Sequence, residues 1–266
     1  MSDEAISINI IGYKVASVAS LPRNDVKLLF CRILCTTRKE IRMKIKRGFI
    51  FICALAAAGL MLSSRALAYG SGDFQYWNTN GIEWKARKDW KVALGEELRF
   101  GGAAGELHYQ HTDIDAVYSG IAPWLDIKAG YRHIFNKGKK HWEYENAPNF
   151  NAIVKFDVWG FKVSDRSRIE YRNIEDKKNN WRYRNQLKAR FSLRFEKVEV
   201  APYLADEIFL DCSNRGELTR NRLYSGIELG MFKHIVVDVY YLWQTSKGKS
   251  GWVDYNVLGT KLKVSF

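Results

Sequence analysis

Cysteine and proline are scarce in this chain, and it has no long apolar run. The 266 residues include four cysteines and four prolines, and so low a cysteine content excludes a disulfide-rich scaffold. The single apolar run, residues 49–62, is shorter than the roughly 20 residues that a membrane-crossing helix needs. The chain is therefore not a polytopic helical membrane protein. No Gly-X-Y repeat is present, which excludes collagen, and a hydrophobic share of 47% excludes a disordered chain.

Motifs of common catalytic and nucleotide-binding sites are also absent. The sequence after residue 68 contains no glycine-rich phosphate loop, no C-x-x-C pair and no metal-spaced histidine cluster. It keeps one cysteine, Cys212, so no disulfide can form within a single chain. We therefore expect no metal and no cofactor. The net charge of +13 would favour nucleic acid binding in a cytoplasmic protein, but the export signal described next argues against a nucleic acid partner.

The apolar run near the N-terminus has the features of an export signal. Basic residues between Lys44 and Arg47 precede it, and the small residues Ala66 and Ala68 follow it. A basic start, a short apolar stretch and small residues at positions −3 and −1 describe a secretory signal peptide. We therefore predict a signal peptide over residues 43–68, cleaved after Ala68. A transmembrane anchor is the alternative, and the run of 14 residues is too short to favour it.

Residues 1–42 lie upstream of this complete signal peptide, which begins at Met43. We interpret them as a non-native extension from a start site assigned too early, and a long N-terminal region of the signal is the alternative. The mature chain then spans residues 69–266 and contains all nine tryptophans. An exported, aromatic-rich chain that cannot form an internal disulfide is typical of the bacterial cell envelope.

From residue 73 onward, apolar residues recur with a period of two, which indicates β-strands. The clearest segment, residues 181–191, carries Trp181 and Leu187 on one face and Arg182 and Arg184 on the other. Eleven such segments are visible, joined alternately by short turns and by longer polar loops. Short turns at one rim and longer loops at the other are typical of an outer-membrane barrel.

The alternation predicts an all-β fold, a transmembrane antiparallel up-and-down β-barrel. Bacterial single-chain barrels normally have an even number of strands, so we expect about twelve strands, with ten as the fallback. A soluble barrel with charges outside is the alternative, because periodicity alone does not distinguish the two. Aromatic residues such as Trp181 and Phe191 gather near the ends of the apolar faces. These girdles favour a place in the bacterial outer membrane, in contact with its lipid.

The carboxyl end carries a second membrane signal. The chain stops at Phe266, in a segment whose alternate residues are apolar. A terminal aromatic residue on an amphipathic last strand resembles the signal that the outer-membrane barrel insertion machinery reads. We therefore predict that Phe266 is an insertion signal and that this machinery is a partner.

Several segments resemble the family called domain of unknown function 2490. They are residues 73–79, 167–172, 181–185 and 221–226, with residues 240–244 and 256–262 near the carboxyl end. The resemblance spans essentially the whole mature chain. It implies an outer-membrane β-barrel, and it implies neither an established activity nor catalytic residues.

The charged face indicates a function if it points into the lumen. We expect the lumen to be lined by Arg166, Arg168, Arg172, Arg182, Arg184, Lys188, Arg190, Glu143, Glu145, Glu170 and Glu207. A basic wall attracts anions, so the sequence predicts a narrow passive channel for small solutes, anionic ones in particular. In the alternative, arginine and glutamate pair across the lumen and close it, which leaves a structural or adhesive barrel.

An outer-membrane lipid-modifying enzyme, a hydrolase or an acyltransferase, is a further alternative. Such an enzyme needs a nucleophile and a base within hydrogen-bond reach. The mature chain contains five histidines: His108, His111, His133, His141 and His234. His108 and His111 are three residues apart, so in a flat strand they point to opposite faces. No G-x-S-x-G motif surrounds Ser119 or Ser225, and we expect no catalytic residue and no enzyme activity.

Overall fold

The structure is a computed structural model, and it describes residues 72–138, 141–195, 198–231, 233–248 and 251–266. The predicted upstream extension (1–42) and signal peptide (43–68), with the cleavage residues Ala66 and Ala68, lie outside the described residues. In the part of the chain that is described, no helix is long and apolar enough to cross a membrane. The regular structure there consists of β-strands, in agreement with the predicted all-β class.

Twelve strands run through the described residues and belong to one sheet. Eleven of them have between 11 and 17 residues, enough for a tilted membrane-spanning strand of about 9–11 residues. The other strand, β8, has only three residues. The strands are β1 (Asp73–Arg87), β2 (Trp90–Gly101), β3 (Glu106–Ala122), β4 (Leu125–Lys137), β5 (Trp142–Val158), β6 (Phe161–Ile174), β7 (Asn180–Arg190), β8 (Leu193–Phe195), β9 (Val198–Asp211), β10 (Glu217–Met231), β11 (Ile235–Gly248) and β12 (Gly251–Ser265).

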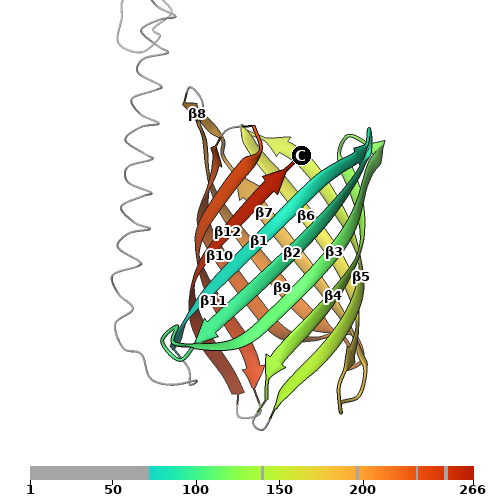
Figure 1. Ribbon diagram of the computed structural model, residues 1–266, viewed down its shortest axis with the longest axis vertical. Coiled ribbons are helices and arrows are strands. Elements are labelled where there is room, and N and C mark those ends of the chain that lie inside the picture. Colours follow the sequence, from blue (N-terminus) through green and yellow to red (C-terminus); the bar gives the residue numbers. More distant parts are fainter. Residues whose placement is uncertain (1–71, 139–140, 196–197, 232, 249–250) are drawn as a thin grey trace, which may run out of the picture. The chain divides into compact units, whose positions relative to one another are not determined.

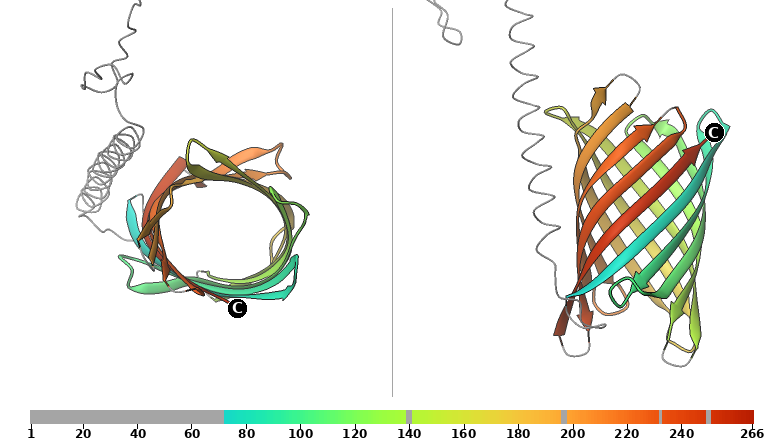
Figure 2. Two further views of the ribbon diagram at one scale, coloured as in Figure 1. Left: turned by 90° about the horizontal axis from the view of Figure 1, so that it is seen from above. Right: turned by 60° about the vertical axis from the view of Figure 1, so that its left-hand side comes forward.

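The sheet closes on itself into a barrel of tilted strands (Figures 1 and 2). Its wall consists of eleven strands, because β8 continues β7 along β9 instead of adding to the circumference. Arg190 of β7 pairs with Tyr203, and Leu193 of β8 pairs with Val200 in the same register. β9 then pairs with β10, and the chain continues around the wall to β12.

The barrel closes through a parallel seam between β1 and β12, where Asp73 pairs with Tyr255 and Glu83 with Ser265. Antiparallel neighbours alternate in direction, so an odd number of wall strands leaves the first and the last pointing the same way. Twelve strands and the up-and-down order are present as predicted, but only eleven strands form the wall, so the expected even number of barrel strands is not met. The wall departs from antiparallel pairing at this seam.

Apolar side chains cover the outside of the barrel, and charged side chains lie inside it. Trp181 and Leu187 of β7 are 48% and 49% exposed, whereas the side chains of Arg182 and Arg184 are 14% and 8% exposed. Successive side chains of a strand point to opposite faces, so each strand presents one face to the surroundings and one to the lumen. A soluble barrel would have the reverse arrangement, with its apolar face inside.

Tryptophans mark both rims of the exterior. Eight of the nine are exposed, and the ninth, Trp77, is buried inside at 3% exposure. Trp124 and Trp159 lie in short turns, and Trp142 and Trp252 lie where strands leave the longer loops at the opposite rim. Two aromatic girdles around an apolar band characterise outer-membrane barrels. The fold is therefore a β-barrel of the outer-membrane type.

An aromatic cluster fills part of the interior beside β9, β10 and β11. Tyr203, Tyr224 and Tyr240 are 5%, 7% and 2% exposed. Glycines make room for these rings: a Cβ atom on Gly226 would lie 2.7 Å from the Cβ atom of Tyr240, and one on Gly259 would overlap the Tyr240 ring. The lumen is therefore narrowed on this side by packed rings.

Candidate functional site

Charged side chains of β6, β7 and β9 meet inside the barrel. These strands are neighbours in the wall, and their inward positions carry charged residues because polar and apolar residues alternate along them. Glu170 and Glu207 are each 1% exposed, and Arg168 and Arg184 are 3% and 7% exposed. Charges removed from bulk water to this extent need partners of opposite sign.

Arg184 connects the two buried carboxylates. Its Nη1 atom donates to Oε1 of Glu170 at 3.0 Å, and its Nη2 atom donates to Oε1 of Glu207 at 2.7 Å. Glu170 also accepts a hydrogen bond of 2.5 Å from Nε of Arg182, and Glu207 accepts one of 2.7 Å from Nη2 of Arg166. Three neighbouring strands are thus joined by one continuous network of ion pairs.

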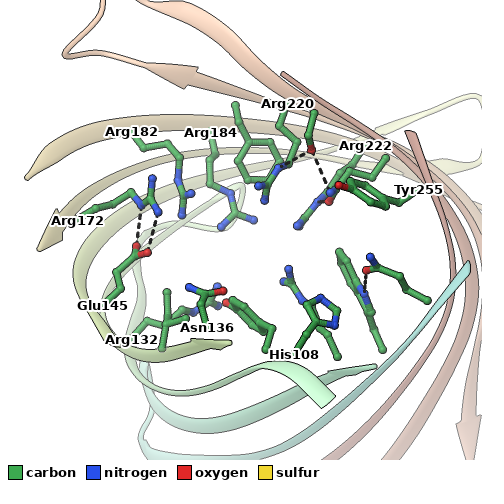
Figure 3. A pocket seen from close by; sticks show the side chains of 18 residues that line it. His108, Arg132, Asn136, Glu145, Arg172, Arg182, Arg184, Arg220, Arg222 and Tyr255 are labelled. Atoms are coloured by element: carbon green, nitrogen blue, oxygen red, sulfur yellow. Dashed lines mark hydrogen bonds and ion pairs between the residues drawn. The ribbon is translucent and has the colours of Figure 1, made fainter. Parts of the chain in front are cut away.

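Each of the eleven residues that we expected in the lumen has an ion-pair partner. The pairs outside the network just described are Arg168 with Glu170, Arg172 with Glu145, Lys188 and Arg190 with Glu228, and Glu143 with Lys177. The contact of Arg172 with Glu145 is bidentate, with two hydrogen bonds of 2.7 Å (Figure 3). Glu143, at the loop end of β5, and Arg190, the last residue of β7, are the most exposed of the eleven, with side chains 29% and 32% exposed.

A cavity of about 270 Å³ lies inside the barrel beside this network (Figure 3). Within the described residues, Glu145 is the only carboxylate that lines it, and seven arginines do so. They come from five strands and are Arg99, Arg132, Arg172, Arg182, Arg184, Arg220 and Arg222. Figure 3 shows the guanidinium groups of β7 and β10 side by side, facing His108 and Asn136 across the cavity.

The sequence prediction found part of this lining. Arg172, Arg182, Arg184 and Glu145 are in the predicted set, and the remaining lining arginines are Arg99, Arg132, Arg220 and Arg222. Period-two alternation is the signal that could have identified Arg99, which lies between Leu98 and Phe100. The signal is weaker for the other three, because His133 and Asn221 are among their outward neighbours. The sequence could not have predicted that these four arginines lie near the arginines of β7. Only closure of the wall brings strands such as β2 and β10 to the same cavity.

Two aromatic rings hold Arg99 in place. Its guanidinium carbon lies 3.8 Å from the centroid of the Trp77 ring and 4.0 Å from that of Tyr109. Its Nε atom donates to Oε1 of Glu97 at 2.7 Å. Cation–π contacts stabilise a guanidinium group and restrict its orientation. Arg99 is therefore a fixed positive charge at the cavity wall.

Arg220 has no carboxylate partner among the described residues. Its Nε atom donates to the hydroxyl oxygen of Ser246 at 3.2 Å. Arg222, the next inward residue of β10, donates from Nε to Oε1 of Gln244 at 2.7 Å, and its Nη1 atom lies 3.6 Å from Oε2 of Glu207. On this side of the cavity, neutral groups position the arginines, and positive charge exceeds negative charge.

His108 and His111 both lie inside the barrel, so the expectation of opposite faces was wrong. The pairing of β2 with β3 shifts register between Arg99 and Phe100, which inserts His108 as the extra residue of a β-bulge. His108 lines the cavity, and Nε2 of His111 lies 3.1 Å from Oδ2 of Asp113. In the described part of the chain, no group of histidine, cysteine, aspartate and glutamate is arranged to hold a metal ion.

A row of polar residues crosses the outer face of β2 to β5. Glu96, Thr112, His133 and Asn146 are successive register partners on these four strands. Nδ1 of His133 lies 2.7 Å from Oδ1 of Asn146, which also accepts a hydrogen bond from the hydroxyl of Tyr131. A hydroxyl, an imidazole and an amide therefore lie next to one another on the exterior, which carries other polar pairs as well, such as Asn221 with Asp206.

Comparison with known proteins places the chain in a family. No curated protein matches it. The solved structure of LpxR from Salmonella typhimurium is similar, with 9% sequence identity and a TM-score of 0.43, over 66% of this chain and 83% of that one. The model of a family described as "Protein of unknown function (DUF2490)" matches residues 74–256, which confirms the resemblance seen in the sequence. The chain belongs to this family.

Proposed function

We propose that this barrel lies in the bacterial outer membrane and forms a narrow passive channel for small anionic solutes. The apolar exterior with tryptophans at both rims supports contact with outer-membrane lipid. Phe266 follows β12 at the edge of the wall, 68% exposed, and its N–H donates to the carbonyl oxygen of Glu83 at 2.9 Å. In this proposal the barrel insertion machinery recognises Phe266. The proposed channel has no enzyme activity and uses no cofactor.

The observation that carries the channel proposal is the lining of the cavity, with seven arginines and one carboxylate. Fixed positive charges in a narrow lumen raise the local concentration of anions and repel cations. Arg99, Arg182 and Arg184 are held by carboxylates or aromatic rings, so these charges stay in the lumen without a solute. The arrangement favours anions over neutral or cationic solutes.

A closed structural or adhesive barrel competes with the channel, since the ion pairs of Glu170 and Glu207 occupy part of the lumen. A lumen plugged at that level would pass no ions. The cavity of about 270 Å³ beside these pairs is the reason to favour a narrow channel. Ion passage distinguishes the two functions directly.

The test is conductance of the purified full chain in planar bilayers separating two KCl concentrations. We expect discrete current steps and a reversal potential displaced toward that of chloride. Reversing charge with Arg182→Glu and Arg184→Glu should weaken this preference. Arg220→Gln, which removes no ion pair from the network described above, should weaken it in a barrel that still forms, whereas Arg194→Glu on the exposed β8 should leave it unchanged. Bilayers without current steps would remove the channel proposal.

A second function, modification of outer-membrane lipid, is supported by the polar row on the outer face. Thr112 and His133 are register partners, and Asn146 orients the imidazole through the contact of 2.7 Å. Nucleophilic catalysis needs a hydroxyl within hydrogen-bond reach of a base that a third group orients, and in this proposal the Thr112 hydroxyl comes within that reach of His133 when lipid binds. Mass spectrometry of phospholipid and lipopolysaccharide incubated with the protein tests this function. Turnover lost in His133→Ala but kept in His234→Ala would support it, and no turnover would remove it.

A further inference from the structure

We infer that the arginine-lined cavity is a binding site for a compact anion with at least two negatively charged groups, phosphoryl or carboxylate. The inference deepens the channel proposal, and it rests on that proposal for the route by which the anion enters the lumen. It adds that a multivalent anion stays bound where a monovalent anion passes.

The charges around the cavity do not balance. Six of the seven lining arginines pair with the carboxylates Glu97, Asp113, Glu145, Glu170 and Glu207. Arg166 and Arg168 pair with two of the same carboxylates. Eight of these nine arginines share five carboxylates, and Arg220 has no carboxylate partner among the described residues. With the buried Asp73, which accepts a hydrogen bond from the lining residue Gln75, nine arginines face six carboxylates in this part of the described interior. Repulsion among arginines in excess of the carboxylates is stronger inside the barrel than in water, because the protein wall has a lower dielectric constant. Binding of an anion with several charges reduces this repulsion.

The guanidinium groups approach the cavity from opposite sides. Arg220 and Arg222 reach it from β10 next to Arg184 of β7, while Arg132 reaches it from the other side, where His108 also lies (Figure 3). Guanidinium groups bind phosphate and carboxylate oxygens through two parallel hydrogen bonds. A ligand with one anionic group satisfies one side only, whereas a ligand with two groups spans the cavity and satisfies both.

One arginine of β10 is positioned without a carboxylate partner among the described residues. Arg220 uses its Nε atom for the Ser246 hydroxyl, and Arg222 uses its Nε atom for the amide oxygen of Gln244. Both contacts fix the side chain through Nε, and Arg222 also lies 3.6 Å from Glu207, whereas the charge of Arg220 is not offset by such a pair. Such preorganised donors lower the ordering cost that a ligand must overcome on binding.

The cavity has room for a small ligand. Its volume of about 270 Å³ is well above the roughly 10–15 Å³ that one water molecule needs on the same measure. This space accommodates a small polyanion with part of its hydration, and the polar lining does not suit an acyl chain.

Pyrophosphate is the probe, with citrate as the carboxylate counterpart and acetate as the monovalent control. Added to bilayers containing the full chain, pyrophosphate should reversibly block the chloride current, and acetate should not. Isothermal titration calorimetry of the detergent-solubilised protein should detect binding that weakens as salt is added. Tighter binding of pyrophosphate or of citrate identifies the phosphoryl or the carboxylate class as the ligand.

Arg220→Gln should weaken pyrophosphate binding about tenfold or more, since hydrogen bonds to charged groups are lost. It leaves no carboxylate unpaired, so the barrel should still form, and Arg220→Lys should restore part of the affinity. The matched control Arg194→Gln removes one charge from the exposed β8 and should change affinity by less than about twofold.

The two proposals fail in different ways. Chloride current without block and without heat of binding would overturn the binding site and leave the channel. Heat of binding with electrically silent bilayers would support the site and overturn the channel. Equal losses of affinity in Arg220→Gln and Arg194→Gln would also overturn the site, because only the overall charge would then matter.

Discussion

Arg184 donates from Nη2 to Oε1 of Glu207 at 2.7 Å, inside a barrel where Glu207 is 1% exposed. The same carboxylate accepts hydrogen bonds from Arg166 at 2.7 Å and from the hydroxyl of Tyr224 at 3.1 Å. Glu207 of β9 is therefore a common acceptor for side chains of β6, β7 and β10. One negative charge therefore joins side chains of three other strands on this side of the wall.

Replacing that charge by Glu207→Gln should lower the free energy of unfolding by about 3–5 kcal/mol, as when one partner of a buried ion pair is removed. Arg166 and Arg184 would then face one another without their shared carboxylate. Urea unfolding in detergent, followed by tryptophan fluorescence, measures the change. The control Glu143→Gln breaks an exposed pair with Lys177 and should cost less than about 1 kcal/mol. Equal costs would contradict the role of the network.

The direction of strand side chains leads to a second prediction. Ile169→Arg places a charge on the outer face of β6, between the register partners Phe150 and Tyr183, and in a lipid bilayer it should reduce stability by about 2–4 kcal/mol near mid-membrane. Gln186→Arg places the same charge inside, between its register partners Glu207 and Arg166, and should cost less. Unfolding in lipid vesicles compares the two variants. An Ile169→Arg variant as stable as the unsubstituted chain would contradict burial of this face in lipid.

Tyr240 leads to a third prediction, because its ring covers Gly259 across the pairing of β11 with β12. Gly259→Ala places a methyl group into the ring and should destabilise the barrel by about 1–3 kcal/mol. Gly81 is a matched control, since a Cβ atom there would meet its nearest neighbour, the carbonyl oxygen of Leu94, at an ordinary 3.5 Å. Thermal unfolding should separate the two variants. Similar midpoints would show that the ring moves aside without cost.

The tryptophans provide a fourth prediction. Eight are exposed on the outside, and Trp77 is buried beside Arg99. In vesicles of brominated lipid, most of the tryptophan emission should be quenched, because quenching by lipid bromine requires contact with the outer face. The emission that remains should fall further in Trp77→Phe. Emission unaffected by brominated lipid would contradict the two aromatic girdles.

Strand positions follow closely from the sequence. The alternation of Trp181 and Leu187 with Arg182 and Arg184 predicted a strand over residues 181–191, and β7 covers Asn180–Arg190. It also predicted which face carries the charges. Alternation of faces is a property of neighbouring residues in one strand, so it does not depend on how the other strands are arranged.

The candidate site was only partly predictable. Arg172, Arg182 and Arg184 were expected in the lumen, but nothing in the sequence indicated that Arg220 lies near them without a carboxylate of its own. The inward position of His108 was missed because it depends on a β-bulge, and a bulge reverses the face that simple alternation assigns.

Local alternation by itself determined an all-β chain with an apolar and a charged face on each strand. The tertiary structure decided that eleven strands close the wall, that β1 and β12 meet in parallel, and that arginines of five strands share one cavity. The physical reason is that closure depends on strand number, tilt and stagger together. Strand number, tilt and stagger are set by pairing between residues as distant in sequence as Asp73 and Tyr255. A local sequence pattern therefore does not predict them.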